Sequence, residues 1–486
     1  MKKPENKIML IAYADSIGKN LRDLDRILSE KFPGLFGGLH VLPFYPSSGD
    51  RGFAVIDYDT VDPSFGTWED IDHLADQYYM MADFMLNHVS IRSREFRDYM
   101  EKGDESAYRD MFIDWDKFWP PGRPNREDMD VLYRRKERGP YLTFTRRDGK
   151  QVRLWNTFFE EQIDIDPRSE ATRDYYERNL KRIASHVPLI RFDAFAYASK
   201  RPGTSCFFVE PDIWDVLEIG MEPLRESGTE ILPEIHENYT IQMKMAEKGY
   251  WVYDFALPML LLHGLKSGRT DRLIHWLNIC PRKQFTTLDT HDGIGVVDVA
   301  GLLSAEEIDL VRTDVDRILS DAKPYIKFPG MIKTSGKKAQ LYQLGCTYYS
   351  ALDCNDDAYL LARIVQFFAP GIPQVYYVGL LAGKNDVEAL KRGEELRSIN
   401  RHTFSEEEID KALESPMLQR MYEIMRFRNS YPAFGGEISI GHCGKGGALS
   451  ITWTKEGAQT TLTADFCTKR YSIRYRDTRT GEWRTL

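Results

Sequence analysis

Cysteine is scarce in this sequence: there are six cysteines among 486 residues, and no two form a Cys-x-x-Cys pair. Scattered cysteines in a long chain indicate reduced, mostly buried thiols rather than a disulfide framework or a zinc site. No uninterrupted apolar run approaches the roughly 20 residues that span a bilayer. The first apolar run, Ile8 to Ala14, has no cleavage signature after it and is interpreted as a strand rather than a signal peptide. We therefore expect a cytoplasmic protein.

An excess of positive charge is also lacking. The formal net charge is −9, with 74 acidic and 65 basic residues, and no basic stripe stands out. This composition argues against a nucleic-acid-binding surface. Hydrophobic residues make up 42% of the chain, which is enough for a large core and for more than one domain. Neither nucleic acid nor a membrane is expected as a partner.

Short apolar runs alternate with stretches of helical spacing along most of the chain. In residues 20–32, for example, apolar side chains recur at the spacing of one helix face. Eight runs fit strands, and they cover residues 8–14, 38–44, 79–88, 189–197, 231–236, 250–256, 284–292 and 372–377. Strands that alternate with helices in this way predict an α/β fold in which a parallel sheet closes into a (β/α)8 TIM barrel.

Two connections are too long for plain barrel loops. We expect the catalytic barrel to comprise residues 1–88, 166–293 and 357–434. Residues 89–165 would form an inserted domain after the third strand, and residues 294–356 a second one after the seventh strand. Loops of this length are usually functional or carry their own structure. Residues 435–486 contain short alternating runs, which predict a small C-terminal antiparallel β domain.

The run from Leu189 to Tyr197 holds an arginine and an aspartate within an otherwise apolar strand. Arg191 and Asp193 are two residues apart, so both side chains leave the strand on the same face. A guanidinium beside a carboxyl group lowers its pKa and keeps it ionised, as a nucleophile requires. The alternative is a buried structural ion pair, and the carboxylates downstream favour the catalytic interpretation.

Two more carboxylates lie at or near the ends of other predicted strands: Glu234 on the fifth and Asp292 on the seventh. Catalytic residues of barrels come from the ends of several strands. Two carboxylates about 5 Å apart suit a retaining glycosidase mechanism with a nucleophile and an acid/base. Glu234 lies in a largely apolar segment, which suits a general acid. Each carboxylate alone could cap a helix, but three in barrel-strand positions favour catalysis.

Further polar and aromatic residues follow the same strands. His88 and His291 could be core histidines or metal ligands, but neither has a His or Cys partner at ligand spacing. Donors to sugar hydroxyls fit them better. Asp50 and Arg401 could hold the far hydroxyls of a sugar ring, or each could form a surface salt bridge. Two aromatic residues could be apolar walls of the sugar site or simply belong to the core: Phe53 and Tyr197.

These motifs resemble those of a known family. Four of them resemble the conserved regions of the α-amylase superfamily, glycoside hydrolase family 13: His88, Arg191-Phe-Asp193, Glu234 and His291-Asp292. The longer segments Leu288 to Gly295, Pro370 to Gly383 and Ile399 to His402 are similar to its sucrose phosphorylase subfamily. The resemblance covers nearly the whole chain. It implies a barrel with two inserted domains and a C-terminal β domain, and a phosphorylase that acts on small-molecule substrates.

The resemblance also implies roles for single residues. Asp193 would be the nucleophile, Glu234 the acid/base and Asp292 the transition-state stabiliser. Tyr342 and Gln343 resemble a mobile loop that touches fructose or phosphate. The residues that would bind or adjoin glucose in the donor subsite are Asp50, His88, Gln162, Arg191, His291 and Arg401.

A phosphate acceptor needs guanidinium or backbone donors beside a dry pocket. By the resemblance, either Arg134 or Arg135 would face the phosphate. Asn87 resembles the residue that binds calcium in many α-amylases. The subfamily is not expected to need this metal, so we predict neither a metal nor a cofactor. A homodimer is a further expectation from the family.

The acceptor depends on the loop that contains Tyr342. Relatives that act on sucrose 6-phosphate often have histidine at this position, so Tyr342 favours sucrose, while Lys337 and Lys338 leave sucrose 6-phosphate open. The fragment Gly393 to Ser398 also resembles glucosylglycerol phosphorylases. We expect glucosyl transfer from sucrose to phosphate. The alternatives are the other two phosphorylase specificities, an α-glucosidase or a transglucosylase. A non-catalytic sugar-binding barrel is disfavoured because all three carboxylates are present.

Overall fold

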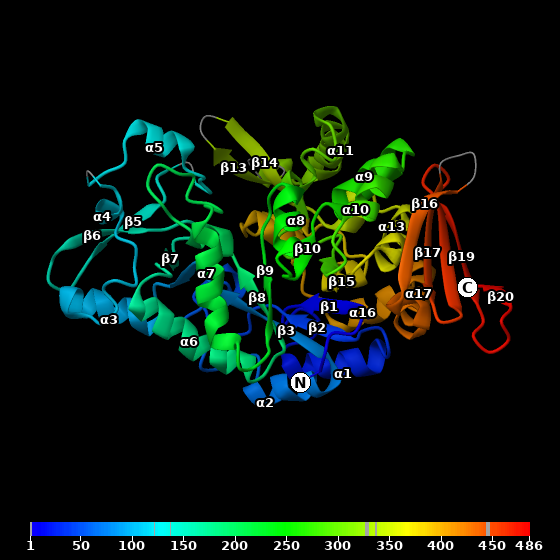
Figure 1. The fold of residues 1–486 in the computed structure, drawn as a ribbon, viewed down its shortest axis with the longest axis horizontal. Coiled ribbons are helices and arrows are strands. Elements are labelled where there is room, and N and C mark those ends of the chain that lie inside the picture. Colours follow the sequence, from blue (N-terminus) through cyan, green and yellow to red (C-terminus); the bar gives the residue numbers. More distant parts are fainter. Residues whose placement is uncertain (1, 121, 137, 326–329, 336–337, 444–447) are drawn as a thin grey trace.

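The centre of the molecule is a parallel sheet of eight strands that curls into a nearly closed barrel (Figure 1). The computed structural model describes residues 2–120, 122–136, 138–325, 330–335, 338–443 and 448–486, with only the backbone at 330–335 and 338–340. Neighbouring strands follow the order β10, β11, β15, β1, β2, β3, β8, β9, which confirms the predicted (β/α)8 barrel. The strands are β1 (Met9–Ala12), β2 (Gly38–Val41), β3 (Tyr79–Met85), β8 (Leu189–Asp193), β9 (Glu230–Pro233), β10 (Val252–Asp254), β11 (Gln284–Thr286) and β15 (Ile372–Tyr376).

The barrel strands are shorter than the apolar runs that predict them. Strand β3 ends at Met85 rather than at His88. His88 instead begins a separate strand, β4 (His88–Ser90), which pairs antiparallel with β7 (Gln162–Asp164). The apolar run continues past the barrel because the loops over its mouth are buried as well, as at Leu86. In this chain a continuous apolar run therefore indicates burial more reliably than strand length.

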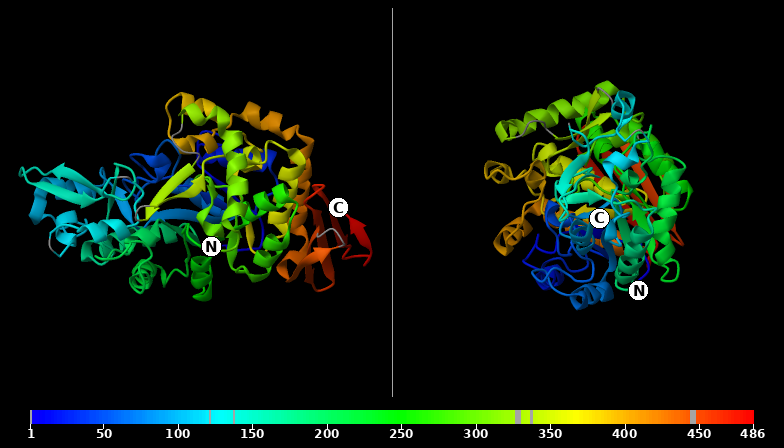
Figure 2. Two further views of the ribbon diagram at one scale, coloured as in Figure 1. Left: turned by 90° about the horizontal axis from the view of Figure 1, so that it is seen from above. Right: turned by 90° about the vertical axis from the view of Figure 1, so that its left-hand side faces the viewer.

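Helices cover the outside of the barrel, as Figure 2 shows from two further sides. The predicted helix at residues 20–32 is α1 (Leu21–Lys31), and its apolar face is buried. The Asn20 side chain accepts hydrogen bonds from the backbone of Arg22 and Asp23, which fixes the start of this helix. The other helices around the barrel and its last connection are α2 (Trp68–Gln77), α6 (Glu170–Ala184), α7 (Asp212–Met221), α8 (Tyr239–Glu247), α9 (Leu257–Ser267), α10 (Asp271–Ile279), α12 (Tyr348–Ala351), α13 (Asp356–Phe368), α14 (Tyr377–Leu380), α15 (Val387–Lys391), α16 (Glu406–Leu413) and α17 (Pro416–Ser430).

Side chains inside the barrel form a core of their own, which includes Met81, Leu189 and Phe285. A much larger buried cluster lies between the strands and the surrounding helices. The interior is therefore packed and is not a channel. Polar chemistry is left to the mouth, at the carboxyl ends of the strands, as is general for this architecture.

Two long connections leave the carboxyl ends of β3 and β11. The first extends to one end of the molecule (Figure 1) and the second lies over the centre. The first contains α3 (Arg94–Lys102), α4 (Trp115–Phe118), α5 (Arg126–Val131), β5 (Tyr141–Thr145), β6 (Gln151–Trp155) and β7. The second contains α11 (Ala305–Ile318) and a sheet of β12 (Ile294–Gly295), β14 (Lys338–Leu344) and β13 (Gly330–Ser335).

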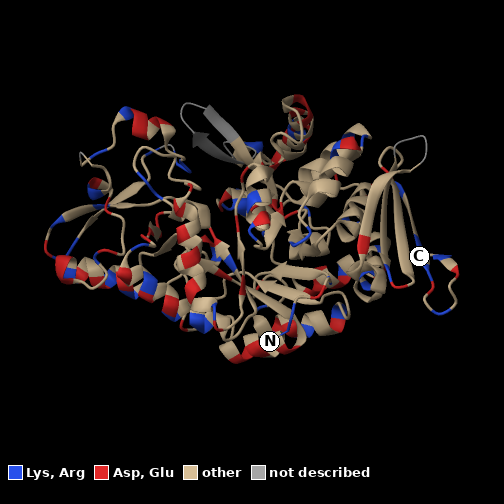
Figure 3. Cartoon of the chain, viewed as in Figure 1, with Lys and Arg blue, Asp and Glu red and all other residues tan. Residues whose placement is uncertain are grey.

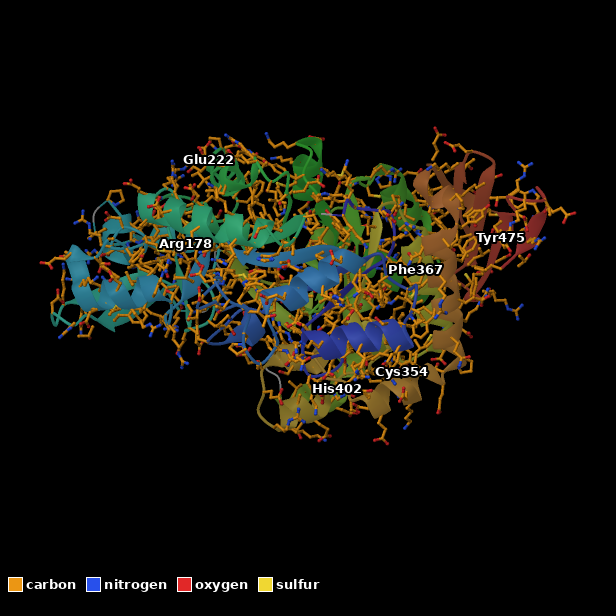
Figure 4. The ribbon with its side chains drawn as sticks, turned by 90° about the horizontal axis from the view of Figure 1, so that it is seen from below. Arg178, Glu222, Cys354, Phe367, His402 and Tyr475 are labelled. Atoms are coloured by element: carbon orange, nitrogen blue, oxygen red, sulfur yellow. The ribbon has the colours of Figure 1, made fainter. Side chains whose placement is uncertain are left out.

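The C-terminal part is a five-stranded antiparallel sheet, as predicted. It consists of β16 (Glu437–Cys443), β17 (Ala448–Lys455), β18 (Ala458–Asp465), β19 (Arg470–Arg476) and β20 (Trp483–Thr485). Trp453 on β17 donates its indole N–H to the backbone oxygen of Phe368 at the end of α13, at 2.8 Å. Figure 4 labels Phe367 on the same helix and Tyr475 on β19, and shows the sheet beside the barrel helices.

Acidic and basic residues alternate along the outer helices (Figure 3). Among the described residues, no helix has the length and apolar character needed to cross a bilayer. All six cysteines are free. Cys206, Cys280 and Cys346 are buried whereas Cys443 and Cys467 are exposed, so the expectation of mostly buried thiols holds for only half of them.

Candidate active site

A pocket opens at the carboxyl ends of the barrel strands and is also lined by both inserted segments. Most residues proposed for the donor site and the acceptor loop are in its wall. The cavity has a volume of about 50 Å³. The lining residues are Asp50, Phe53, His88, Arg135, Phe158, Gln162, Asp193, Ala194, Tyr197, Glu234, His291, Asp292, Tyr342, Gln343 and Arg397.

Buried charge, rather than size, distinguishes this pocket. A groove of about 600 Å³ lies between the first turns of α1 and α2, but the charged side chains in it, Arg22 and Glu69, are exposed. At the barrel mouth, the side chains of Asp193, Glu234 and Asp292 are only 15%, 10% and 11% exposed. Ionisable groups gathered in a buried cleft are the usual mark of a catalytic site.

Asp193 is the last residue of β8, and the chain turns away from the sheet directly after it. Ala194 has φ +54°, a left-handed conformation that is strained for alanine. The carboxylate of Asp193 lies 2.8 Å from Nη1 of Arg191 on the same face, as predicted. The same nitrogen is 2.5 Å from Oδ1 of Asp83, whose other oxygen is 2.7 Å from Nε2 of His40. A buried chain of charges thus holds Asp193 in place.

The pKa of Asp193 differs from the expectation. Burial raises it, Arg191 lowers it, and the nearby charge of Glu234 raises it further, to about 8. The expectation that Arg191 lowers the pKa overall is therefore wrong, because burial outweighs the guanidinium. Nη2 of Arg191 also lies 3.7 Å from Oε1 of Glu234, so the two carboxyl groups share one counter-charge. Both carboxyl groups therefore depend on the same guanidinium for charge compensation.

Glu234 directly follows β9 and lies beside Asp193. Its Oε2 accepts a hydrogen bond from the backbone N–H of Ala194 at 3.4 Å. Its Oε1 lies 3.3 Å from Nε2 of His236. One carboxylate oxygen thus faces the strained turn after Asp193, and the other faces a histidine on its own segment. The position suits proton transfer to and from a group bonded next to Asp193.

Asp292 belongs to a different electrostatic environment. Its Oδ1 is 3.1 Å from Nη2 of Arg397 and 3.7 Å from Nη2 of Arg401. Burial alone would raise the pKa of Asp292, but Arg397, His291 and Arg401 outweigh it and hold the pKa well below its usual range. Oδ1 of Asp50 lies near the same two arginines, 3.6 Å from Nη1 of Arg397 and 3.8 Å from Nη1 of Arg401. Asp292 is therefore ionised at any physiological pH.

The two arginines play different parts in the wall. Arg397, which the sequence analysis did not propose, lines the pocket. Arg401, which it did propose, is not among the lining residues, and its Nε donates to the backbone oxygen of His291 at 2.9 Å. Arg401 thus supports the loop that carries His291 and Asp292. Arg191 likewise acts from behind the wall, through Asp193 and Glu234.

The proposed sugar-binding side chains come together from β4, β7 and the loops after β2 and β11. Nε2 of His88 lies 3.1 Å from the backbone oxygen of Phe53, and burial lowers the pKa of His88 to about 4. His88 is therefore neutral at physiological pH. The ring of Phe53 stacks on His291 at 4.8 Å. Gln162 donates to Asp50 at 3.4 Å, and Tyr197 meets the ring of Phe158 edge-on at 4.9 Å.

The residues proposed to contact the acceptor lie on the inserted segments. The guanidinium of Arg135 lies over the ring of Tyr342 at 4.3 Å, so Arg135 closes the pocket from above Tyr342 and Gln343. Arg134, its neighbour, is not among the lining residues. Lys337 lies outside the described residues, and the side chain of Lys338 is not described, so their proposed role stays a prediction.

Comparison with known proteins agrees with this geometry. The family "Alpha amylase, catalytic domain" matches residues 31–210. A sucrose phosphorylase from Streptococcus mutans is 50% identical over 438 residues, which is 90% of each chain. The chain belongs to the sucrose phosphorylase subfamily of glycoside hydrolase family 13. The family resemblance expected from the sequence is thereby confirmed, and the protein is a glycoside phosphorylase, that is, a glucosyltransferase.

Other members of the subfamily are almost as similar. A glucosylglycerol phosphorylase from Marinobacter adhaerens is 40% identical over 99% of both chains. The crystal structure of a sucrose 6F-phosphate phosphorylase from Thermoanaerobacter thermosaccharolyticum superposes with a TM-score of 0.92 at 41% identity, over 100% of this chain and 99% of that one. Similarity of this degree identifies the subfamily but does not separate its acceptor specificities.

Sequence reasoning missed several residues of this phosphorylase site. Asp83 is a charged residue inside an apolar run, which is the same signal that singled out Arg191. Arg397 lies in the fragment Gly393 to Ser398, which the sequence analysis noted for another reason. Phe158 gave no signal, because its place in the wall depends on how the first inserted segment folds.

The Asn87 position is occupied by a cation of the chain itself. Nζ of Lys200 lies 2.9 Å from Oδ1 of Asn87, 2.8 Å from Oδ2 of Asp164 and 2.6 Å from the backbone oxygen of Tyr197. These oxygens would suit calcium, but the ammonium already neutralises them. The arrangement therefore does not fit a calcium ion in this phosphorylase.

The atoms of Glu234, His236 and Asp292 lie within 4.8 Å of one another, which is close enough for a shared metal ion. However, Arg191 lies beside Glu234 and Arg397 beside Asp292. Two guanidinium groups at these carboxylates repel a metal cation. No metal is assigned to this cluster.

Lys200→Met should strongly destabilise the fold. The change leaves the carboxylate of Asp164, which is fully buried, without its cation, and breaking a buried pair costs about 3–5 kcal/mol. Chemical denaturation would measure the free energy of unfolding. The control is Lys181→Met, because Lys181 forms an exposed pair with Glu177, and exposed pairs contribute little to stability. Equal stability of the two variants would contradict the structural role of Lys200.

Proposed function

We propose that this phosphorylase transfers the glucosyl group of sucrose to inorganic phosphate with retention of configuration, giving α-D-glucose 1-phosphate and D-fructose. The observation that carries the proposal is the contact of both Asp193 and Glu234 with Arg191, with Asp292 in the same pocket. A nucleophile and an acid/base in close proximity are what retention requires. The S. mutans relative supports sucrose as the donor.

In the first displacement Asp193 attacks the anomeric carbon of the glucosyl unit. The bond from this carbon to the fructosyl oxygen breaks, and Glu234 gives its proton to that oxygen. The products are a glucosyl ester of Asp193, free fructose and an ionised Glu234. This step requires the proton on Glu234 and an ionised Asp193 when sucrose binds. Asp292, which Arg397 keeps ionised, stabilises the positive charge that develops on the sugar ring.

In the second displacement an oxygen of phosphate attacks the same carbon, and the ester bond to Asp193 breaks. Glu234 takes up the proton of the attacking oxygen, which restores the starting state. A phosphate anion that enters beside these carboxylates is repelled unless cationic donors offset their charge. Arg135 lines the pocket and fills this role in the proposal, whereas Arg134 does not line it.

Two other specificities of the subfamily are the alternatives, because a sucrose 6F-phosphate phosphorylase and a glucosylglycerol phosphorylase are 42% and 40% identical to the chain. Hydrolysis or transglucosylation would use the same three carboxylates, but neither would need the guanidinium of Arg135 in the pocket. Tyr342, which lies under Arg135, favours the unphosphorylated sugar.

A donor panel tests the substrate directly. Phosphate-dependent release of glucose 1-phosphate should be fastest from sucrose when sucrose, sucrose 6-phosphate, glucosylglycerol and glucosylglycerate are compared by kcat/KM. Glucose released without phosphate should be a minor product. A preference for sucrose 6-phosphate of more than about tenfold, which is roughly 1.4 kcal/mol, would replace the proposed donor with the phosphorylated one.

The two carboxylates of the pair should respond differently to substitution by amides. Asp193→Asn should lose several orders of magnitude in turnover on every donor, because an amide is a poor nucleophile. Glu234→Gln should lose sucrose cleavage but keep reacting with α-glucosyl fluoride, whose leaving group needs no proton. Initial rates on both donors measure this, with thermal melting as the folding control. The assignment would be contradicted if the initial rate of Asp193→Asn were within tenfold of the parent rate. It would also be contradicted if Glu234→Gln lost rate equally on both donors.

Arg135→Ala should raise the KM for phosphate by about 10- to 100-fold, the range expected for one lost charge-assisted hydrogen bond. Water should then compete for the glucosyl ester, so glucose should increase relative to glucose 1-phosphate. Arg134→Ala is the matched control and should change the KM for phosphate much less. An unchanged product ratio in Arg135→Ala, or the larger effect in Arg134→Ala, would move the phosphate role away from Arg135.

A further inference from the structure

His236 connects the acid/base candidate to a second buried carboxylate. Its Nε2 lies 3.3 Å from Oε1 of Glu234, and its Nδ1 lies 3.4 Å from Oδ2 of Asp298. The ring stacks on Phe255 with centroids 3.8 Å apart and meets Tyr342 edge-on at 5.5 Å. The side chain is only 2% exposed. Packing on both sides fixes the plane of the imidazole, so its two nitrogens point at the two carboxylates.

The side chain of Asp298 makes few other polar contacts among the described residues. Its side chain is 1% exposed, and its Oδ1 has no hydrogen-bond partner among the described residues. It lies in a short 3₁₀ turn, η5 (Val297–Val299). At Gly295 a Cβ atom would lie 2.4 Å from Oδ2 of Asp298 and 3.3 Å from Nδ1 of His236. The backbone thus leaves room for this pair, which a larger residue at position 295 would disturb.

We propose that Asp298 is a positioning residue for the acid/base: it holds His236 with the Nε2 hydrogen directed at the carboxylate of Glu234. Donation from Nδ1 to Asp298 together with donation from Nε2 to Glu234 requires the imidazolium, in which both ring nitrogens carry hydrogen. Burial lowers the pKa of His236, but Asp298, Glu234 and Asp292 together raise it above its usual value. This direction favours the imidazolium, and in the proposal that form donates to both carboxylates.

The timing of this hydrogen bond gives it a catalytic effect. The bond from Nε2 of His236 is weaker while Glu234 is protonated, and it becomes a hydrogen-bonded ion pair when Glu234 has given its proton to the leaving oxygen. An interaction that strengthens along the reaction lowers the barrier instead of merely tightening substrate binding. The inference rests on the proposed role of Glu234 as the acid. A glucosyl donor whose leaving group needs no proton leaves Glu234 protonated, so it gains nothing from the bond between His236 and Glu234.

The test compares two substitutions of Asp298 on two donors. Asp298→Leu removes the acceptor at Nδ1, and a similar apolar side chain should be tolerated at a buried site. We expect kcat on sucrose to fall about 10- to 100-fold, the range of a hydrogen bond to a charged group, and kcat on α-glucosyl fluoride to change less than threefold. Asp298→Asn retains a polar partner for Nδ1 without the charge. We expect a smaller loss on sucrose than with leucine, with the fluoride rate again preserved.

The control is Asp254→Asn. Asp254 is a buried carboxylate on β10 that accepts a hydrogen bond from Nε1 of Trp276 at 3.0 Å and is not among the pocket residues. The kcat of this variant should stay within twofold of the parent value on both sucrose and α-glucosyl fluoride. A well-folded Asp298→Leu variant whose kcat falls equally on both donors, or on neither, would overturn the inference and leave Asp298 a structural residue. If that variant does not fold, equal losses of Asp298→Asn on the two donors would overturn it.

Failure of the underlying function has a different signature. Glu234→Gln measured alongside should lose sucrose selectively. If Glu234→Gln loses activity on sucrose selectively and the Asp298 variants do not, only the positioning role of Asp298 is contradicted. If Glu234→Gln loses both donors equally, the acid/base assignment itself falls, whatever the Asp298 variants show.

Discussion

The catalytic arrangement depends on one buried cation, the guanidinium of Arg191. Three carboxylates, those of Asp83, Asp193 and Glu234, lie within 3.7 Å of it. Each buried ion without a partner would cost several kcal/mol, so the mouth of the barrel could not hold this much negative charge without the guanidinium. Because Arg191 is two residues before Asp193 on β8, one strand supplies both the proposed nucleophile and its counter-charge. The neighbouring strand β9 then brings Glu234 to the same cation.

A second set of cations lowers the pKa of Asp292, the third carboxylate of the pocket. Arg397 and Arg401 hold the pKa of Asp292 well below its usual range, whereas burial raises that of Asp193 to about 8. All three side chains are carboxyl groups, but their surroundings hold Asp292 ionised and raise the pKa of Asp193. Environments that push the pKa values of acidic groups apart are how a site assigns acid, base and electrostatic roles.

The barrel and its three carboxylates could be predicted from the sequence because both follow from local patterns. A charged pair inside an apolar run marked β8, and the same argument would have found Asp83 on β3. Strand ends could not be predicted, since the loops at the mouth are buried as deeply as the strands. The sign of the Asp193 shift was missed because a local partner, Arg191, was visible whereas the degree of burial was not. Arg397 and Asp298 were missed because their partners lie far away in the sequence.

The acceptor side of the pocket is tied to the acid/base through the backbone. Strand β12 pairs with β14 so that Gly295 faces Gln343, and the N–H of Val296 donates to the oxygen of Tyr342 at 3.0 Å. Asp298 follows two residues later and contacts His236 beside Glu234. A shift of the strand that presents Tyr342 must therefore pull on the turn that holds His236. The pairing of β12 with β14 and the contact of Asp298 with His236 therefore make residues 294–299 and the segment around Tyr342 one connected unit. A change of register in β14 would also move the turn that holds Asp298, and with it the contact at His236.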